Sequence, residues 1–198
     1  MRLNLIGVRF QLNPNQSQLA ASLAVSGAAV SRYIDILCDV MLLRRLPAWH
    51  GNVGKRLVRA PKVYVRDSGL AHALLGLQSV DSVLSHPAAG QTWEGFVIEQ
   101  LIAAAPHAQA SFYRTAHGAE ADLVLSLRNG QTWVIEIKRS SAPSVSRGFH
   151  LAGVDVGATR KLLVAPVSTP YTLRDGVEVM NPLAATTRLA QADGVVTA

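Results

Sequence analysis

The stretch WVIEIK at residues 133–138 places an acid and a lysine two positions apart inside an apolar run. On a β-strand, residues two apart project from the same face, so Glu136 and Lys138 should point together while Ile135 and Ile137 point the other way. In apolar surroundings a charge is tolerated when it is paired or bound to a metal. The segment is therefore either a plain Glu–Lys ion pair on a strand or part of a metal-dependent phosphodiesterase site.

The residues around this stretch predict an α/β domain. Apolar periodicity and turn residues indicate a helix over 93–105, strands over 111–115, 122–127 and 132–138, a second helix over 145–156 and a last strand over 160–165. The inward side of the first helix is expected to consist of Phe96, Val97, Leu101 and Ile102. Because Asn129-Gly130 is a hairpin signal, we expect the three middle strands to form a meander before the second helix crosses over.

This strand order gathers several acids at one end of the sheet. In adjacent antiparallel strands the start of one lies beside the end of the next, so Asp122 is expected beside Glu136 and Lys138, with Glu94 reaching in from the helix. Hard oxygen ligands suit Mg²⁺ or Mn²⁺, and such an ion can polarise a scissile phosphate and activate water. Lys138 would orient that water or neutralise charge on phosphorus. Glu120 is either an auxiliary ligand or a solvated turn residue.

Composition bounds the possible functions. The 198 residues suffice for one domain or two small ones, and 49% hydrophobic residues with a mean hydropathy of +0.21 suffice for a packed core. A net charge of +6 and a pI near 10.0 favour an anionic partner, most commonly nucleic acid. We expect a cytoplasmic protein without a membrane partner, since we find no long apolar run or secretory signal. The single cysteine and scattered histidines argue against a disulfide and against zinc.

Charge divides the chain into two parts. Residues 32–66 carry eight basic side chains against two acids, and a region rich in glycine, serine and proline follows at 76–90. We therefore predict a winged helix-turn-helix domain over residues 1–78 and a second domain over 79–198. The first would contain a helix at 18–23, a turn with Ser26 as N-cap, and a helix over about 28–41. The buried stripe of that second helix is expected to be Val30, Tyr33, Ile34, Leu37 and Met41.

A basic hairpin is predicted to form the wing of this first domain. Its strands would come from residues 42–46 and from 55–58 through 62–65, joined by a glycine-containing turn. In the DNA-reading interpretation the second helix enters the major groove and the wing contacts phosphates. The alternative is a helix-turn-helix used for packing or partner contact, because its outward residues are small or acidic. The residues expected to contact DNA are Ser31, Arg32, Lys55, Arg56, Arg59, Lys62 and Arg139.

The segment GNVGKR at residues 51–56 looks superficially like a phosphate-binding loop. Only two residues separate its glycines where four are needed, and Arg56 replaces the hydroxyl residue that would hold magnesium. We interpret it as a hairpin turn. No nucleotide cofactor and no ATP hydrolysis are expected from this chain alone.

Several segments together carry a family resemblance. WEGFVIEQL at 93–101, YRT at 113–115 with GAEADLVL at 118–125, and IEIKRS at 135–140 resemble the C-terminal half of a bacterial and archaeal family of AAA-type ATP-binding proteins. The resemblance extends to KRLV at 55–58, PKVY at 61–64 and RDSGL at 66–70, and so covers nearly the whole chain. In that family an ATPase module precedes a winged helix and a domain of unassigned function.

That last domain is similar to the PD-(D/E)xK nuclease superfamily, a mixed sheet flanked by helices, as in restriction endonucleases and archaeal Holliday-junction resolvases. The resemblance implies metal binding by Asp122 and Glu136, catalysis by Lys138 and support from Glu94. The ATPase module of the family is absent here. The chain is thus a standalone or truncated relative, or it works with a separate ATPase subunit.

The sequence therefore leads to one main functional hypothesis and two alternatives. The main hypothesis is a magnesium-dependent DNA phosphodiesterase, or a remnant of one, with a DNA-binding winged helix. The first alternative is a non-catalytic DNA-binding or protein-interaction module, and the second is a regulator or antitoxin-like partner. An enzyme should bind Mg²⁺ or Mn²⁺ at Asp122 and Glu136, whereas a binding module need not.

Overall fold

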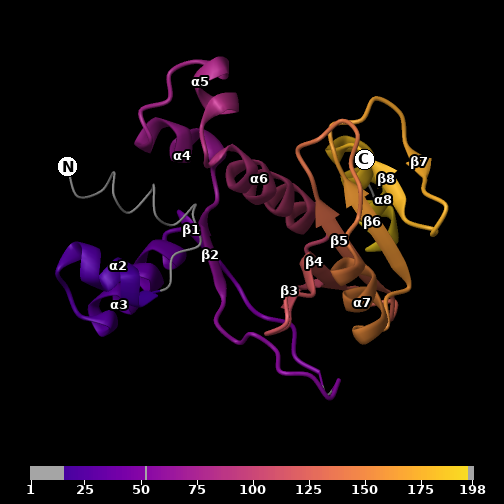
Figure 1. Ribbon diagram of the computed structural model, residues 1–198, viewed down its shortest axis with the longest axis horizontal. Helices are drawn as coiled ribbons and strands as arrows, with labels where there is room; N and C mark the ends of the chain where they lie inside the picture. Colours follow the sequence, from indigo (N-terminus) through magenta and orange to yellow (C-terminus); the bar gives the residue numbers. More distant parts are fainter. Residues whose placement is uncertain (1–15, 52, 196–198) are drawn as a thin grey trace. The chain divides into compact units, whose positions relative to one another are not determined.

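The computed structural model of the chain describes residues 16–51 and 53–195, which form helices and two β-sheets (Figure 1). It divides into two compact units, each made of two segments of the chain. Unit 1 contains residues 1–45 and 62–96, and unit 2 contains residues 46–61 and 97–198. The predicted α/β class is confirmed. The contiguous division into residues 1–78 and 79–198 stays a prediction.

The described residues of unit 1 that precede helix α6 (Ala89–Ala104) form two helices, a two-stranded sheet and two further short helices. In order these are α2 (Gln16–Leu23), α3 (Gly27–Asp39), β1 (Leu43–Leu46), β2 (Lys62–Val65), α4 (Ser68–Leu74) and α5 (Val80–Ser85). Ser26 caps α3 as predicted, since its Oγ accepts a hydrogen bond of 3.1 Å from the Ala29 amide. The apolar side chains of α2 and α3 pack with those of β1, β2 and α4 in one small core, built around Leu19, Val30, Ile34, Leu43, Val65 and Ala71.

The buried stripe of α3 is narrower than the sequence predicted. Val30 and Ile34 are buried and Leu37 packs against them, but Tyr33 is 60% exposed and Met41 is 66% exposed. Met41 lies beyond the end of α3 in a left-handed conformation, with φ at 63°, so helical spacing does not apply to it. Tyr33 is not part of the small core. The prediction was wrong at these two positions because it assumed a wider contact surface.

Unit 2 is built on a six-stranded mixed sheet with the strand order β3-β4-β5-β6-β8-β7. Its strands are β3 (Gln109–Arg114), β4 (Glu120–Ser126), β5 (Thr132–Ile137), β6 (Arg160–Val164), β7 (Tyr171–Thr172) and β8 (Glu178–Met180). The meander of β3, β4 and β5 is antiparallel, as predicted, and β6 then pairs parallel to β5 after the crossover helix α7 (Arg147–Asp155). Strands β7 and β8 and the helix α8 (Pro182–Ala192) were not predicted.

Helix α7 packs on the sheet of unit 2. Helix α7 packs Phe149 and Ala152 against Val124 of β4 and Val134 of β5 in one fully buried cluster. Helix α6 (Ala89–Ala104) begins in unit 1 and continues into unit 2. The prediction that Phe96 of α6 points inward was wrong, because Phe96 is 37% exposed and Ile98 is buried instead. Apolar residues occur on most sides of this helix, so their spacing did not single out the buried side.

Residues 62–65 pair with residues 43–46 as predicted for the hairpin, but residues 55–58 do not belong to its second strand. The intervening residues are 46–61. They join β1 to β2 by a long excursion that belongs to unit 2. Phe112 of β3 donates its amide to Pro47 and accepts from the amide of Trp49, at 3.0 and 2.7 Å, and Val58 donates to Arg114 at 2.9 Å. Residues 55–58 were therefore assigned to the wrong partner. We call residues 46–61 the edge loop, because they satisfy backbone groups at the otherwise open edge of β3.

No single helix in the described part of the chain is long and apolar enough to cross a membrane. Helices α2 and α3 meet that length only when taken together, and they are bent by 100° relative to each other.

Candidate functional site

The structure brings Asp122 and Glu136 together at the end of β5. The last regular pair between β4 and β5 is Leu123 with Ile135, so continuing the antiparallel register places Asp122 opposite Glu136. The Asp122 Oδ2 atom accepts a hydrogen bond of 2.9 Å from the Ile137 amide. Both residues are buried, with 8% of Asp122 and 6% of Glu136 exposed. This confirms the predicted proximity of the two acids, whereas their role in binding metal stays a prediction.

The hydrogen bond from the Ile137 amide lies where the regular pairing between β4 and β5 ends. The Asp122 carboxylate accepts from a backbone amide of β5 beyond the last regular pair with β4. Beyond Ile135, β5 stays paired with β6, and the Lys138 amide donates to Val164 at 2.9 Å. The two acids thus lie where β4 and β5 separate. At this point the backbone of Glu136 is still paired with β6.

A β-bulge at Asp122 contributes to this geometry. Ser111 of β3 pairs with Val124 and Tyr113 pairs with Ala121, so Asp122 and Leu123 together face the single residue Phe112. A bulge turns a side chain out of the regular alternation and is common beside active sites. The sequence prediction relied on strict alternation and could not detect it. No glycine or proline marks the position.

The pKa of Glu136 depends on its burial and on the charges of Asp122 and Lys138 beside it. Burial, followed by the neighbouring Asp122, raises the pKa of Glu136 to about 7, and Lys138 offsets part of that rise. The Lys138 Nζ lies 2.5 Å from Glu136 Oε1, as expected from their shared strand face. The lysine side chain is 42% exposed, so it can also meet a molecule arriving from solvent. The site therefore holds a buried acid pair with a single accessible ammonium beside it.

The donor set can be compared with the needs of a metal. Within the described residues, no group of three or more histidine, cysteine or acidic side chains is placed to hold an ion. Two carboxylates are sufficient for Mg²⁺ or Mn²⁺, because these ions keep several waters and share substrate phosphates as ligands. An oxygen-only pair with a raised pKa fits a hard cation, which would relieve the repulsion between Asp122 and Glu136. Glu120 lies 3.5 Å from the guanidinium of Arg114 and also contributes to the raised pKa of Glu136, so its role as an auxiliary ligand stays a prediction.

Glu94, the predicted helper of this site, belongs to unit 1. Its Oε1 atom accepts a hydrogen bond of 3.0 Å from the Lys62 ammonium, whose side chain is almost fully buried. This ion pair accounts for the charge of Lys62, which was predicted to contact DNA. A role for Glu94 beside the acid pair of unit 2 stays a prediction.

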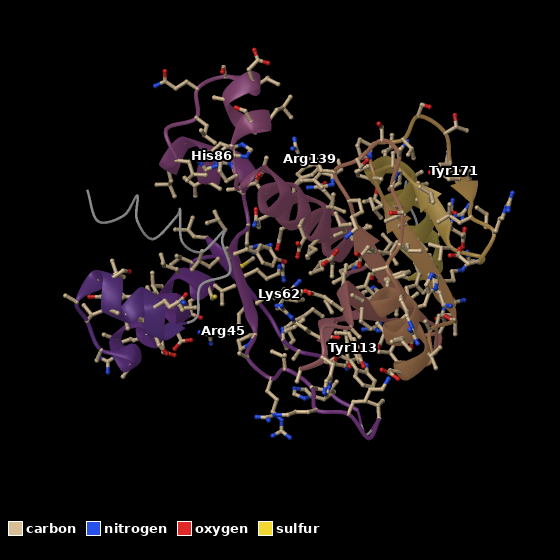
Figure 2. The ribbon with its side chains drawn as sticks, viewed as in Figure 1. Arg45, Lys62, His86, Tyr113, Arg139 and Tyr171 are labelled. Carbon is tan, nitrogen blue, oxygen red and sulfur yellow. The ribbon has the colours of Figure 1, made fainter. Side chains whose placement is uncertain are left out.

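The other residues predicted to contact DNA lie on three segments. Ser31 is half-buried and Arg32 is exposed on α3, where nearby Asp35 pairs with Arg45 at 2.7 Å. Arg139 is exposed directly after β5 (Figure 2). The remaining three are exposed on the edge loop: Lys55, Arg56 and Arg59. Their contact with DNA stays a prediction.

The edge loop is tied to unit 2 by a cluster that the sequence analysis missed. Asp155, at the end of α7, receives Lys55 Nζ at 2.6 Å and also the hydroxyl of Tyr113, which lies on β3 (Figure 2). Burial alone would raise the pKa of Asp155, but the hydrogen bonds from Lys55 and Tyr113 hold it below its usual value. Burial and this acid raise the pKa of Tyr113. Residues so far apart in the chain give no local sequence signal.

Comparison with known proteins adds family-level information. A family model of a domain of unknown function, DUF8612, matches residues 4–81, and a second such model, DUF4143, matches residues 89–184. DUF4143 is commonly the C-terminal region associated with AAA-type ATPases. Uncharacterized proteins of Mycobacterium bovis and Mycobacterium tuberculosis are each 41% identical over 161 residues, or 81% of this chain and 36% of the relative. The chain thus spans about a third of those relatives. No solved structure matches it.

Proposed function

We propose that unit 2 carries a Mg²⁺- or Mn²⁺-dependent phosphodiesterase site of the PD-(D/E)xK kind and acts on DNA. The observation that carries this proposal is the cluster of Asp122, Glu136 and Lys138 where β4 and β5 separate. A bound cation would relieve the repulsion between the two buried carboxylates, and the half-exposed lysine beside them can meet a phosphate. The order of an antiparallel meander followed by a parallel crossover agrees with the resemblance noted from the sequence.

Each residue has a distinct part in the proposed reaction. Asp122 and Glu136 would hold the ion, which when bound supplies a polarised phosphate and a more acidic water. The Ile137 amide fixes Asp122 in place, and the backbone of β5 fixes Glu136 relative to it. Lys138 would donate to a phosphate oxygen and oppose the negative charge that develops there. Burial of both acids keeps bulk water away from one side of the reacting group.

Unit 1 is proposed to act as a winged helix-turn-helix. Its helices α2 and α3, the cap at Ser26 and the following two-stranded sheet support this arrangement. The expected wing is the part that differs, since the edge loop belongs to unit 2. Because DUF4143 is commonly associated with AAA-type ATPases, an ATPase is the proposed protein partner.

The requirement for a metal can be tested by calorimetric titration with Mn²⁺. We expect the parent chain to bind the ion and the double variant Asp122→Asn, Glu136→Gln to lose at least about tenfold in affinity, because charge and ligand atoms are both removed. Asp175→Asn is the matched control, since that exposed acid pairs with His150 instead. Equal binding by the parent and the double variant would reject the metal site.

A non-catalytic interaction module is the second candidate function. It is favoured by apolar side chains that are exposed around the end of α3, namely Tyr33, Ile36, Val40, Met41 and Leu42. The closed ion pair between Glu136 and Lys138 is also compatible with a purely structural role. DNA binding that is equal in Mn²⁺ and in a chelator, together with no cleavage of any DNA, would favour this candidate.

A further inference from the structure

Two neighbouring hollows on unit 2 share a basic lining. The larger, of about 1210 Å³, is formed by the edge loop, and its basic lining residues are His50, Lys55, Arg56 and Arg59. The smaller, of about 390 Å³, is lined by Lys55, His117, Arg147 and the first turn of α7. No aspartate or glutamate is among the described residues that line either hollow. Asp155 pairs with Lys55 at 2.6 Å and offsets its charge, so Arg147 supplies the net positive charge of the smaller hollow. A concave surface with a net positive charge favours an anionic ligand.

The smaller hollow has well-fixed walls. One wall is the turn at residues 115–119, where the Thr115 amide donates to Ala119 at 2.9 Å and the Ala119 amide donates to the Thr115 hydroxyl at 3.0 Å. Helix α7 begins directly against this turn, because a Cβ at Gly148 would lie only 3.1 Å from Ala119 Cα. The third wall is Lys55, which Asp155 holds in place. Such a cavity is preformed, so little ordering is needed for a ligand to bind.

The topology places this hollow beside the acid pair. The turn at 115–119 leads into β4, whose start lies next to the end of β5, and α7 also starts from that end of the sheet. Glu136 projects from the same side of β5 as Val134, which packs against α7. The hollow and the acid pair therefore lie at the same end and on the same side of the sheet.

We infer that the smaller hollow, through His117 and Arg147, binds a backbone phosphate of the nucleic-acid strand whose neighbouring phosphodiester lies at Asp122 and Glu136. The inference rests on the proposed function for the identity of the strand. The larger hollow lies along the edge loop, where the exposed Arg56 and Arg59 would contact further phosphates of the same strand. Arg147 and His117 are thus positioning residues for the substrate, and neither was among the residues predicted from the sequence.

The test is the affinity of a short labelled single-stranded oligonucleotide, measured by fluorescence anisotropy in a chelator, so that no metal is required. Arg147→Gln and His117→Gln should each weaken binding, roughly tenfold for the arginine, since a charged hydrogen bond to phosphate is lost. For Arg147→Gln the salt slope should also fall by about 0.7, because one phosphate contact by a cationic side chain is lost. Arg128→Gln is the matched control, because Arg128 is exposed in the turn at the opposite end of β4.

Each outcome then decides a separate claim. Equal losses in Arg147→Gln and Arg128→Gln would overturn the inference, since they would show only a loss of net charge. Inorganic phosphate that binds the parent but not Arg147→Gln, with the affinity for the oligonucleotide unchanged in that variant, would also overturn it and assign the hollow to free phosphate. A parent that never cuts DNA, with binding still lost in Arg147→Gln, would reject the proposed function alone. A parent that cuts DNA, with Arg147→Gln binding and cutting equally well, would reject the inference alone.

Discussion

Replacing Glu136 with glutamine is expected to raise the free energy of unfolding by about 3 kcal/mol at about pH 8 and to change it little at about pH 5. Burial, followed by Asp122, raises the pKa of Glu136 from 4.5 to about 7. The folded chain therefore binds a proton at this residue more tightly than the unfolded chain does. This stabilising contribution is complete below a pH of about 4.5 and is lost as the pH rises through about 7. Glutamine resembles the protonated acid and does not suffer the loss.

Urea unfolding over this pH range measures the effect, provided that the slope of the transition is the same for both proteins. Glu178→Gln is the matched control. Its carboxylate binds Arg160 at 2.8 Å and also binds Arg188, so its removal should lower stability at about pH 8. If the curves of the parent and Glu136→Gln ran parallel from about pH 5 to about pH 8, the raised pKa of Glu136 in the folded chain would be disproved.

Replacing Lys138 with methionine is expected to lower the rate of Mn²⁺-dependent DNA nicking by roughly a hundredfold or more, because the ammonium that opposes charge on phosphorus is lost. The same change removes the partner of Glu136, but the lysine side chain is 42% exposed and the buried acid can take up a proton. The free energy of unfolding should therefore fall by about 1 to 2 kcal/mol at about pH 8 and by less at about pH 5.

The two measurements on Lys138→Met separate a catalyst from a scaffold. A catalytic lysine predicts a nearly unchanged melt at about pH 5 and an abolished nicking activity at the pH of the assay. A purely structural lysine predicts that Lys138→Met melts at a much lower temperature than the parent. It also predicts that the parent does not cut DNA with any metal. Lys161→Met on β6 provides the control, because it makes the same chemical change on the neighbouring strand.

The part of the fold around the acid pair was predictable because local signals agreed there. Strand β5 and the residue after it form an apolar run in which the charged residues Glu136 and Lys138 are two positions apart. The Asn129-Gly130 turn fixes the pairing of β5 with β4. Those two facts were enough to place Asp122 beside Glu136. The parallel position of β6 followed from the crossover, since a helix between two strands favours that topology.

Other features depend on contacts that no local pattern records. Residues 55–58 have the composition of a strand, but their partner is β3, more than fifty residues away, and not the preceding strand β1. The bulge at Asp122 arises from the register between β3 and β4. Phe96 and Tyr33 were misplaced because helical spacing limits the possible faces without saying which face a neighbour covers.

The basic lining of the smaller hollow also could not be predicted from the sequence. Lys55, His117 and Arg147 come from three separate segments, and only the fold brings them together. Lys55 and Arg56 were found because basic residues are dense along that stretch. His117 and Arg147 stand alone in the sequence and carried no such signal.

The most direct test of the phosphodiesterase site is the nicking of supercoiled and branched DNA by the parent chain and by Asp122→Asn, with Mn²⁺ and with a chelator. Asp122 is buried against Glu136 and is held by the Ile137 amide, so asparagine should keep the fold while removing a ligand charge. We predict nicking by the parent in Mn²⁺ alone and a loss of roughly a hundredfold or more in the variant. Nicking that is equal in the two proteins, or absent from a folded parent under every metal, would contradict the account.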